Sequence, residues 1–130
     1  MLKHRRDAEM VLSLTVQKRE PDVTVIEVSG RITIGRESGQ LDAAVIKALD
    51  EGARKLIVDL THVTFIDSTG IGIVAYCFGK ASKAGAQLHV AGANGKVMEV
   101  FEITHIDQVI RFFPNVDSAC EALANTVSAK

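Results

Sequence analysis

The residues best placed to do chemistry stand in one stretch, Phe65–Gly72, which reads FIDSTGIG. It combines two neighbouring hydroxyls, Ser68 and Thr69, with the carboxylate of Asp67 and with two glycines that follow. Glycines near the start of a helix leave backbone N–H groups open to a phosphate. The stretch could therefore cradle the phosphate of a bound nucleotide, or it could offer a hydroxyl of its own as the acceptor of a phosphate.

The nucleotide interpretation rests on residues 70–75, which fit the pattern G-x-G-x-x-A of dinucleotide-binding sites. Two features argue against it. The carboxylate of Asp67 would repel a pyrophosphate, and the next strand ends at residues 90–92 as Val-Ala-Gly, with no acid to bind the ribose. The Gly-Lys pairs at 79–80 and 95–96 lack the glycine and the Ser or Thr of a P-loop. We therefore expect no nucleotide and no other cofactor.

A catalytic serine or a metal site is not indicated either. Ser68 does not stand in a G-x-S-x-G turn, because residue 66 is isoleucine, and no histidine has a sequence position that identifies it as a base. The two cysteines, Cys77 and Cys120, form no CxxC pair and are expected to be buried small hydrophobic residues. The histidines are scattered without metal-ligand spacing: His4, His62, His89 and His105. We expect no catalytic residue, no metal ligand and no enzymatic activity.

A purely structural role for the motif explains only part of it. Asp67, Ser68 or Thr69 could cap a helix, which is worth about 1 kcal/mol. Gly70 and Gly72, however, each cost about 1 kcal/mol of helix propensity relative to alanine. Capping does not explain two glycines there, whereas bare backbone would let another protein approach the start of the helix. The motif therefore favours a surface that another protein contacts.

The composition describes one balanced domain. A chain of 130 residues, 47% of them hydrophobic, suits a single compact domain. Its 15 basic and 16 acidic residues balance, and it has no Trp, which argues against a nucleic-acid binder. Residues 12–17 alternate between apolar and polar, unlike a signal peptide, and no apolar run is long enough to cross a membrane. We expect a cytoplasmic protein with a mobile tail over 1–9 and one domain over 10–130.

Apolar periodicity and the placement of Gly and Pro predict elements in the order β-β-α-β-α-β-α-β-α. This order indicates an α/β fold: a mixed four- to five-stranded sheet, with an antiparallel hairpin followed by β-α-β crossovers, and about four helices. The expected elements are strands 11–18 and 23–29, helix 40–51, strand 55–60, helix 69–83, strand 87–91, helix 95–103, strand 109–113 and helix 118–127.

Local signals refine this prediction. Pro21-Asp22 marks the hairpin turn, and the run at 55–60, which is apolar without alternation, is typical of a central strand covered on both faces. Residues 61–66 are expected to form a loop. Ser38 and Asp117 are expected to cap the helices that follow them.

The motif and its setting match a known family. Residues 67–72, Asp-Ser-Thr-Gly-Ile-Gly, fit the pattern D-S-[ST]-G-[LI]-G and follow a strand that contains Val58-Asp59-Leu60. Gly30, at the end of the second strand, also fits. On these residues the chain resembles the anti-sigma factor antagonists of the STAS domain family, over about residues 11–127.

The resemblance implies a protein switch. It implies that Ser68 is phosphorylated by an anti-sigma factor that is also a serine kinase, and that a PP2C-type phosphatase resets it. The unphosphorylated form would bind the anti-sigma factor and release a sigma factor, and phosphorylation would end that binding. The residues to which the resemblance assigns partner contact are Asp67, Ser68, Thr69, Gly70, Ile71, Gly72, Arg31 and Thr33.

One departure and one alternative stay open. The family often has G-x-[IL]-D after the second strand, where this chain has residues 30–33, Gly-Arg-Ile-Thr. The choice of partner is therefore open, and Thr33 is equally compatible with a simple turn residue. The alternative is a STAS-like scaffold subunit of a transporter or signalling complex, in which Ser68 serves only as cap and contact. The sequence leaves the oligomeric state undetermined.

Overall fold

The protein folds around a single mixed sheet in the order β1-β2-β3-β4-β5. The computed structural model describes residues 12–33 and 39–128, except for the side chains of 125–128, so the expected tail at 1–9 and the expected cap Ser38 lie outside the described residues. The strands are β1 (Ser13–Arg19), β2 (Val23–Ile32), β3 (Lys55–Ile66), β4 (Gln87–Ala91) and β5 (Phe112–Phe113). The helices are α2 (Gln40–Asp50), α3 (Ser68–Lys83), α4 (Gly95–Ile103) and α5 (Val116–Ser128), with a short 3-10 helix η2 (Ile106–Gln108).

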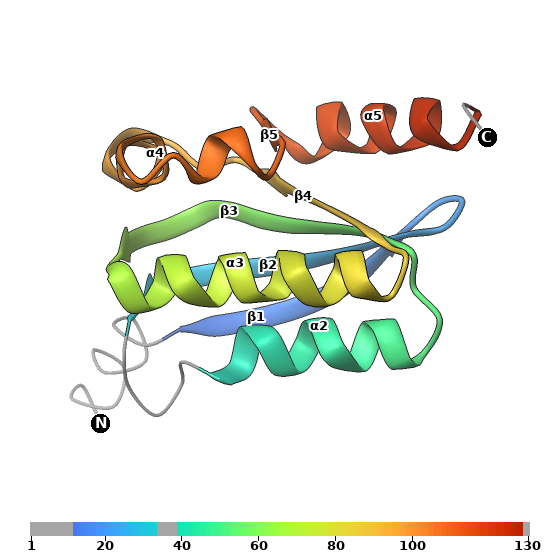
Figure 1. Ribbon diagram of the computed structural model, residues 1–130, viewed down its shortest axis with the longest axis horizontal. Helices are drawn as coiled ribbons and strands as arrows, with labels where there is room; N and C mark the ends of the chain where they lie inside the picture. The colour runs from blue at the N-terminus through green and yellow to red at the C-terminus, as the bar shows by residue number, and fades with distance from the viewer. Residues whose placement is uncertain (1–11, 34–38, 129–130) are drawn as a thin grey trace, which may run out of the picture.

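The topology confirms the α/β fold class expected from the sequence. β1 and β2 pair antiparallel as a hairpin, and every later pair of neighbours is parallel. Each parallel step is made through a helical crossover, which Figure 1 shows along the chain. Among the described residues there are five strands in one sheet and four α-helices.

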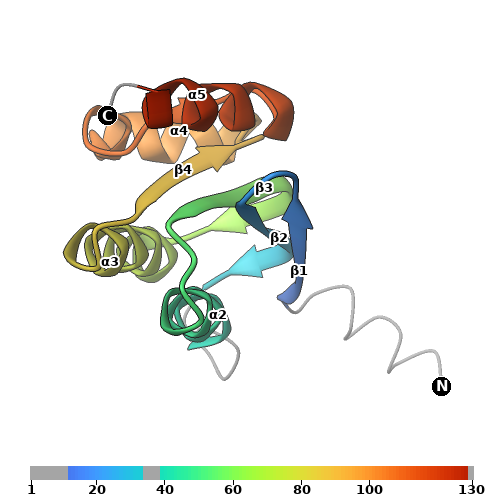
Figure 2. The same cartoon turned by 90° about the vertical axis from the view of Figure 1, so that its right-hand side faces the viewer.

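The strand β3 lies in the middle of the sheet and is covered on both faces. Leu56 and Val58 belong to the larger apolar core, which α2, α3 and α4 share, whereas Ile57 belongs to a smaller core under α5. Figure 2 shows α2 and α3 on one side of the sheet and α5 on the other. A parallel strand covered on both faces needs a continuous apolar run. The prediction that residues 55–60 form a central strand is therefore confirmed.

The predicted loop at residues 61–66 is wrong, because β3 continues to Ile66. The pairing of β3 with β2 contains two register shifts, and β3 has one extra residue at each. Each extra residue moves the side chains that follow to the opposite face. The buried positions are consequently three apart, at Leu60, Val63 and Ile66. A period of three fits neither a strand nor a helix, so the sequence pattern there indicated a loop.

The segment before α5 also differs from the prediction. Only Phe112 and Phe113 of the expected strand 109–113 pair with β4, and η2 occupies residues 106–108. Val109 is 61% exposed, whereas Ile110 is buried in the larger core. The backbone N–H groups of Val109 and Ile110 donate to the Ile106 carbonyl oxygen of the η2 turn, so these two residues of the expected strand do not pair with β4.

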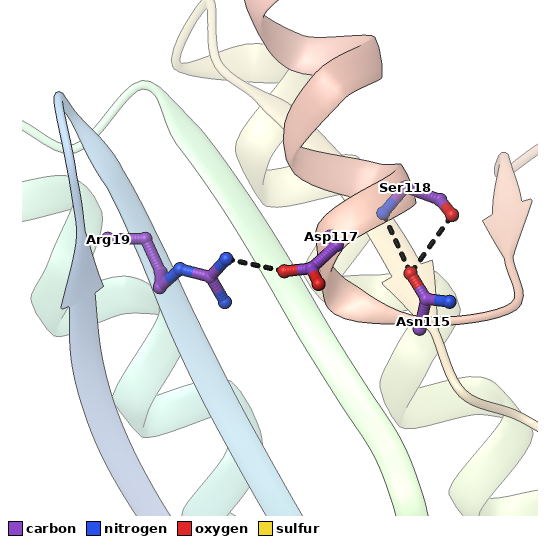
Figure 3. Close-up of polar contacts among 4 residues, drawn as sticks. All are labelled: Arg19, Asn115, Asp117 and Ser118. Carbon is purple, nitrogen blue, oxygen red and sulfur yellow. Dashed lines mark hydrogen bonds and ion pairs between the residues drawn. The ribbon is translucent and has the colours of Figure 1, made fainter.

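The last helix begins at Val116 rather than at 118, and its cap is not Asp117. Asn115 Oδ1 accepts hydrogen bonds from Ser118 N at 2.8 Å and from Ser118 Oγ at 2.9 Å, which is the pattern of an N-cap (Figure 3). Asp117 instead pairs with Arg19 of β1 at 2.6 Å (Figure 3). This exposed ion pair joins α5 to the hairpin.

The cysteines agree only in part with the expectation that both are buried. Cys77 is fully buried on α3, and burial raises the pKa of its thiol to about 12. Cys120 is only partly buried, packed at the edge of the core under α5. None of the described helices is both long and apolar enough to span a membrane.

Candidate functional site

The helix that carries the Ser-Thr pair begins at a carboxylate cap. Asp67 has an extended backbone, and its Oδ1 accepts a hydrogen bond from Gly70 N at 2.9 Å. Asp67 is therefore the cap among the three residues that the sequence allowed, and α3 begins at Ser68, one residue earlier than expected. Asp67 N also donates to the carbonyl oxygen of Ile32 at 3.3 Å. The position of Ser68 is thus fixed by the end of β2 as well as by its own helix.

Of the two neighbouring hydroxyls, that of Ser68 is the accessible one. Ser68 is exposed, whereas Thr69 is half-buried. Ser68 is the first residue of a 16-residue helix. The first turn of a helix presents N–H groups without helical partners and the positive end of the helix dipole. A negative group attached to Ser68 would therefore be tolerated by the helix itself.

The missing side chain of Gly70 is required by packing within the chain. A Cβ built at this position would collide with the carbonyl oxygen of Ile32 and would approach Ile66 Cγ1 to 2.6 Å. The expectation that Gly70 leaves space for another protein is therefore wrong, because β2 and β3 already fill that space. Gly70 instead lets the first turn of α3 lie directly on the ends of these two strands.

The next two motif residues, Ile71 and Gly72, differ in burial. Ile71 is only 7% exposed and packs in the larger core, so it holds α3 on the sheet. Gly72 is exposed, and a Cβ built there would meet no atom within 4 Å. Nothing in the described part of the chain requires glycine at this position. The cost of Gly72 is consistent with a surface that something outside the chain approaches closely.

A buried carboxylate fixes the first bulge of β3, upstream of the motif. Asp59 is 7% exposed, and its Oδ1 accepts hydrogen bonds from Thr61 N at 3.1 Å and Thr61 Oγ1 at 2.6 Å. Gly92 follows β4 with a φ of +78°, and a Cβ built on it would collide with Thr61 Oγ1 and lie 2.9 Å from Asp59 Oδ1. This cluster explains the acid in the Val58-Asp59-Leu60 stretch of the strand. It sets the register that the rest of β3 follows.

The second bulge places an aromatic ring beside the end of β2. Phe65 pairs in register with Arg31, and the Arg31 guanidinium lies over the Phe65 ring, 4.5 Å from its centroid. Thr64 Oγ1 donates to the Gly30 carbonyl oxygen at 3.2 Å across the same pair of strands. The fold thus brings the predicted contact residue Arg31 next to the strand that leads into Asp67.

No local sequence pattern indicates that Phe65 lies at the surface. Phe65 is an apolar residue of the segment expected to form a loop, and it is 43% exposed. Only the bulge, which depends on pairing with β2, turns it outward. Thr33 follows β2 directly and is half-buried. Its role as contact or turn residue stays a prediction.

Comparisons with known proteins agree with this architecture. The family model of the STAS domain matches residues 15–119. The anti-sigma-B factor antagonist of Listeria monocytogenes is 29% identical over 101 residues, which are 78% of this chain and 88% of that relative.

Solved structures share the fold. The crystal structure of an anti-sigma factor antagonist from Mycobacterium paratuberculosis has a TM-score of 0.75 and 24% identity, over 86% of this chain and 93% of that one. The structure of murine solute carrier 26 family member A9, an anion transporter, has a TM-score of 0.69 and 16% identity, over 92% of this chain and 23% of that one. Because the family model covers residues 15–119 of 130, this chain belongs to the STAS domain family.

Proposed function

We propose that the protein is an anti-sigma factor antagonist and that phosphorylation of Ser68 switches off its binding. One observation carries the switch: Ser68 presents an exposed hydroxyl at the first position of α3, and packing against β2 and β3 holds that helix start in place. The antagonist part is supported by relatives of that name, among them the Listeria anti-sigma-B factor antagonist.

In the proposed cycle, the unphosphorylated chain binds an anti-sigma factor that is also a serine kinase. This binding frees a sigma factor. The kinase supplies its own ATP, so this chain needs neither a nucleotide site nor a catalytic residue, and a PP2C-type phosphatase removes the phosphate. The cycle takes place in the cytoplasm and requires no contact of this chain with nucleic acid or a membrane.

The physical basis of the switch is local charge. A phosphate on Ser68 adds about −1.5 to −2 charges at neutral pH. The N-terminus of α3 tolerates that charge, so the fold need not change. A partner surface fitted to a neutral hydroxyl would instead have to bury a dianion beside Asp67. A cost of about 3 kcal/mol already lowers affinity more than a hundredfold.

Ser68 is a better acceptor than Thr69. A kinase must bring the hydroxyl into its own active site, and only Ser68 is exposed. Thr69 is half-buried, and the close packing of Gly70 on β2 and β3 opposes the opening of the first turn of α3 that would expose it further.

The test is a phosphorylation assay. The full chain is incubated with ATP and each serine kinase of the histidine-kinase-like ATPase class from the source organism, and then analysed by peptide mass spectrometry. We expect one phosphate on Ser68 in the wild type and in Thr69→Ala, and none in Ser68→Ala. If no kinase modifies Ser68, the proposed switch is wrong.

A second candidate is a scaffold subunit without a switch. The observation in its favour is the similar domain that forms part of the murine anion transporter. In that case Ser68 only begins a helix and touches a permanently bound partner. A chain that co-purifies with a transporter, with Ser68→Ala and Ser68→Asp retained equally, would support the scaffold over the switch. Transporter genes beside this gene would point the same way.

A further inference from the structure

A large apolar side chain lies at the surface close to the proposed phosphorylation site. Phe65 stands three residues before Ser68 and is 43% exposed, although it belongs to β3. The bulge between the pairs Gly30–Val63 and Arg31–Phe65 accounts for this exposure. A single exposed apolar side chain is common on protein surfaces, so the groups beside the Phe65 ring decide whether it marks an interaction site.

The cation beside this ring has no acidic partner within the described part of the chain. The Arg31 guanidinium lies 4.5 Å from the Phe65 ring centroid and is exposed. The ion pairs of the described residues join Arg19 to Asp117, Lys47 to Glu51 and Lys55 to Asp22. Stacking on the ring orients the planar guanidinium, so less freedom is lost when it pairs with a carboxylate of another molecule.

Phe65 also borders a hollow between the end of β3 and α4. The hollow has a volume of about 230 Å³, and Val97 and Val100 of α4 line it together with Phe65. Lys96 and Glu99 stand at the same hollow. Its volume is several times the ~30 Å³ that one water molecule occupies in the liquid, which gives room for a large apolar side chain.

We propose that Phe65, Arg31 and this hollow form an anchor site for the partner that contacts Ser68. The partner inserts one apolar side chain into the hollow and places carboxylates against Arg31 and Lys96. Aromatic residues and arginine dominate the energetics of protein interfaces, and they do so in small clusters surrounded by weaker contacts. Lys96 and Glu99 line the hollow, and Arg31 on the Phe65 ring adds a second cation beside it, which favours an acidic partner surface over a basic one.

The inference rests on the proposed function, because the partner is taken to be the kinase that modifies Ser68. Phe65 precedes Ser68 by three residues, which keeps their backbones within about 11 Å of each other, so a protein that binds Ser68 can also reach this surface. The anchor site would supply affinity that does not depend on the hydroxyl, while Ser68 supplies the control. A second copy of the chain is the competing occupant.

The experiment measures binding of the purified kinase to the full chain by calorimetry at two salt concentrations. We expect Phe65→Ala to weaken binding about thirtyfold or more, as truncation of an interface hot spot does. Arg31→Gln should weaken binding about tenfold and reduce its salt dependence, because a charged contact is lost.

Tyr76 provides a matched control on another part of the surface. It is 49% exposed on α3, and Lys80 Nζ lies 5.9 Å from its ring centroid, so it too is an exposed ring with a cation over it. Tyr76→Ala should change affinity by less than about threefold, as most contacts outside a hot spot do.

The outcomes separate the two claims. Unchanged binding by Phe65→Ala and Arg31→Gln, with Ser68 still phosphorylated in the wild type, overturns the anchor site and leaves the proposed function standing. If Phe65→Ala and Arg31→Gln abolish self-association of the chain but bind the kinase normally, the anchor site for the kinase is also overturned. If no kinase binds or modifies the wild type, the proposed function fails and the anchor site fails with it. If Phe65→Ala lowers the melting temperature, Arg31→Gln decides, since the Arg31 side chain is exposed.

Discussion

Gly70 packs against the carbonyl oxygen of Ile32 with no room for a Cβ between them. The contact joins the first turn of α3 to the end of β2, and Ile66 of β3 packs against the same glycine. The start of the helix, and with it the Ser68 hydroxyl, is therefore positioned by three elements at once.

Gly70→Ala should destabilise the protein by about 1–3 kcal/mol, because the added methyl meets a backbone carbonyl that cannot move aside. The free energy of unfolding from urea titration measures this loss. Gly72→Ala is the matched control. Its Cβ meets nothing within 4 Å, so it should be as stable as the wild type or more stable, by up to about 1 kcal/mol of helix propensity. Equal losses for both variants would contradict the packing role of Gly70.

Asp67→Ala should cost about 1 kcal/mol of stability, because the hydrogen bond from Gly70 N to the cap is lost. Asp67→Asn should recover most of this loss, since asparagine is an equally good cap without the charge. Thermal and urea unfolding of the two variants measure the difference. An asparagine variant as unstable as the alanine variant would mean that Asp67 acts through its charge rather than as a cap.

Thr61→Val should destabilise the protein by about 1–3 kcal/mol, because the buried Asp59 carboxylate loses one of its donors. Thr61→Ser keeps the hydroxyl and should stay near the wild type. Because the Asp59 cluster sets the register of β3, Thr61→Val should also weaken kinase binding, although Thr61 lies six residues upstream of the Asp67 cap that begins the helix. Normal unfolding and normal binding by Thr61→Val would argue against control of the site by the bulge.

The stability of the protein should fall as pH falls below about 6.5, the usual pKa of histidine. His89 is 6% exposed beside Phe113, and neither of its ring nitrogens has a hydrogen-bond partner among the described residues. Burial lowers the pKa of His89, and the positive charge of Arg111 lowers it further. The Leu88 backbone raises this pKa, but the net shift is downward.

The direction in which stability changes with pH follows from which state of the chain binds a proton at His89 more readily. The unfolded chain takes up a proton at this histidine at a higher pH than the folded chain, so acid favours unfolding. Urea unfolding of wild type and His89→Leu between about pH 7.5 and 5 isolates the effect. The variant should lose less stability than the wild type over that range, and parallel losses would show that His89 is not the group responsible.

Much of the fold could be predicted from local patterns. The alternation at the start of the chain and Pro21-Asp22 indicated the hairpin, and the continuous apolar run at 55–60 indicated the central strand, as the structure has them. Residues 61–66 could not be predicted, because their phase depends on two bulges against β2. In the same way, the apolar run at 109–113 gave no sign of the turn that η2 makes.

Local sequence patterns predicted only part of the site as well. The motif indicated a helix start with an exposed hydroxyl, and the structure has both at Ser68. It could not show that Gly70 serves internal packing while Gly72 is open, because the difference lies in Ile32, which is 38 residues away in the sequence. The exposure of Phe65 likewise depends on its pairing with Arg31, which no local pattern encodes.

The most direct test compares the affinity of one kinase for two forms of the same chain. Unphosphorylated protein and protein phosphorylated at Ser68 are titrated separately by calorimetry, and the melting temperature of each is measured. A local charge switch predicts binding weaker by about a hundredfold or more for the phosphorylated form, with nearly equal melting temperatures. Equal affinities for the two forms would contradict the switch.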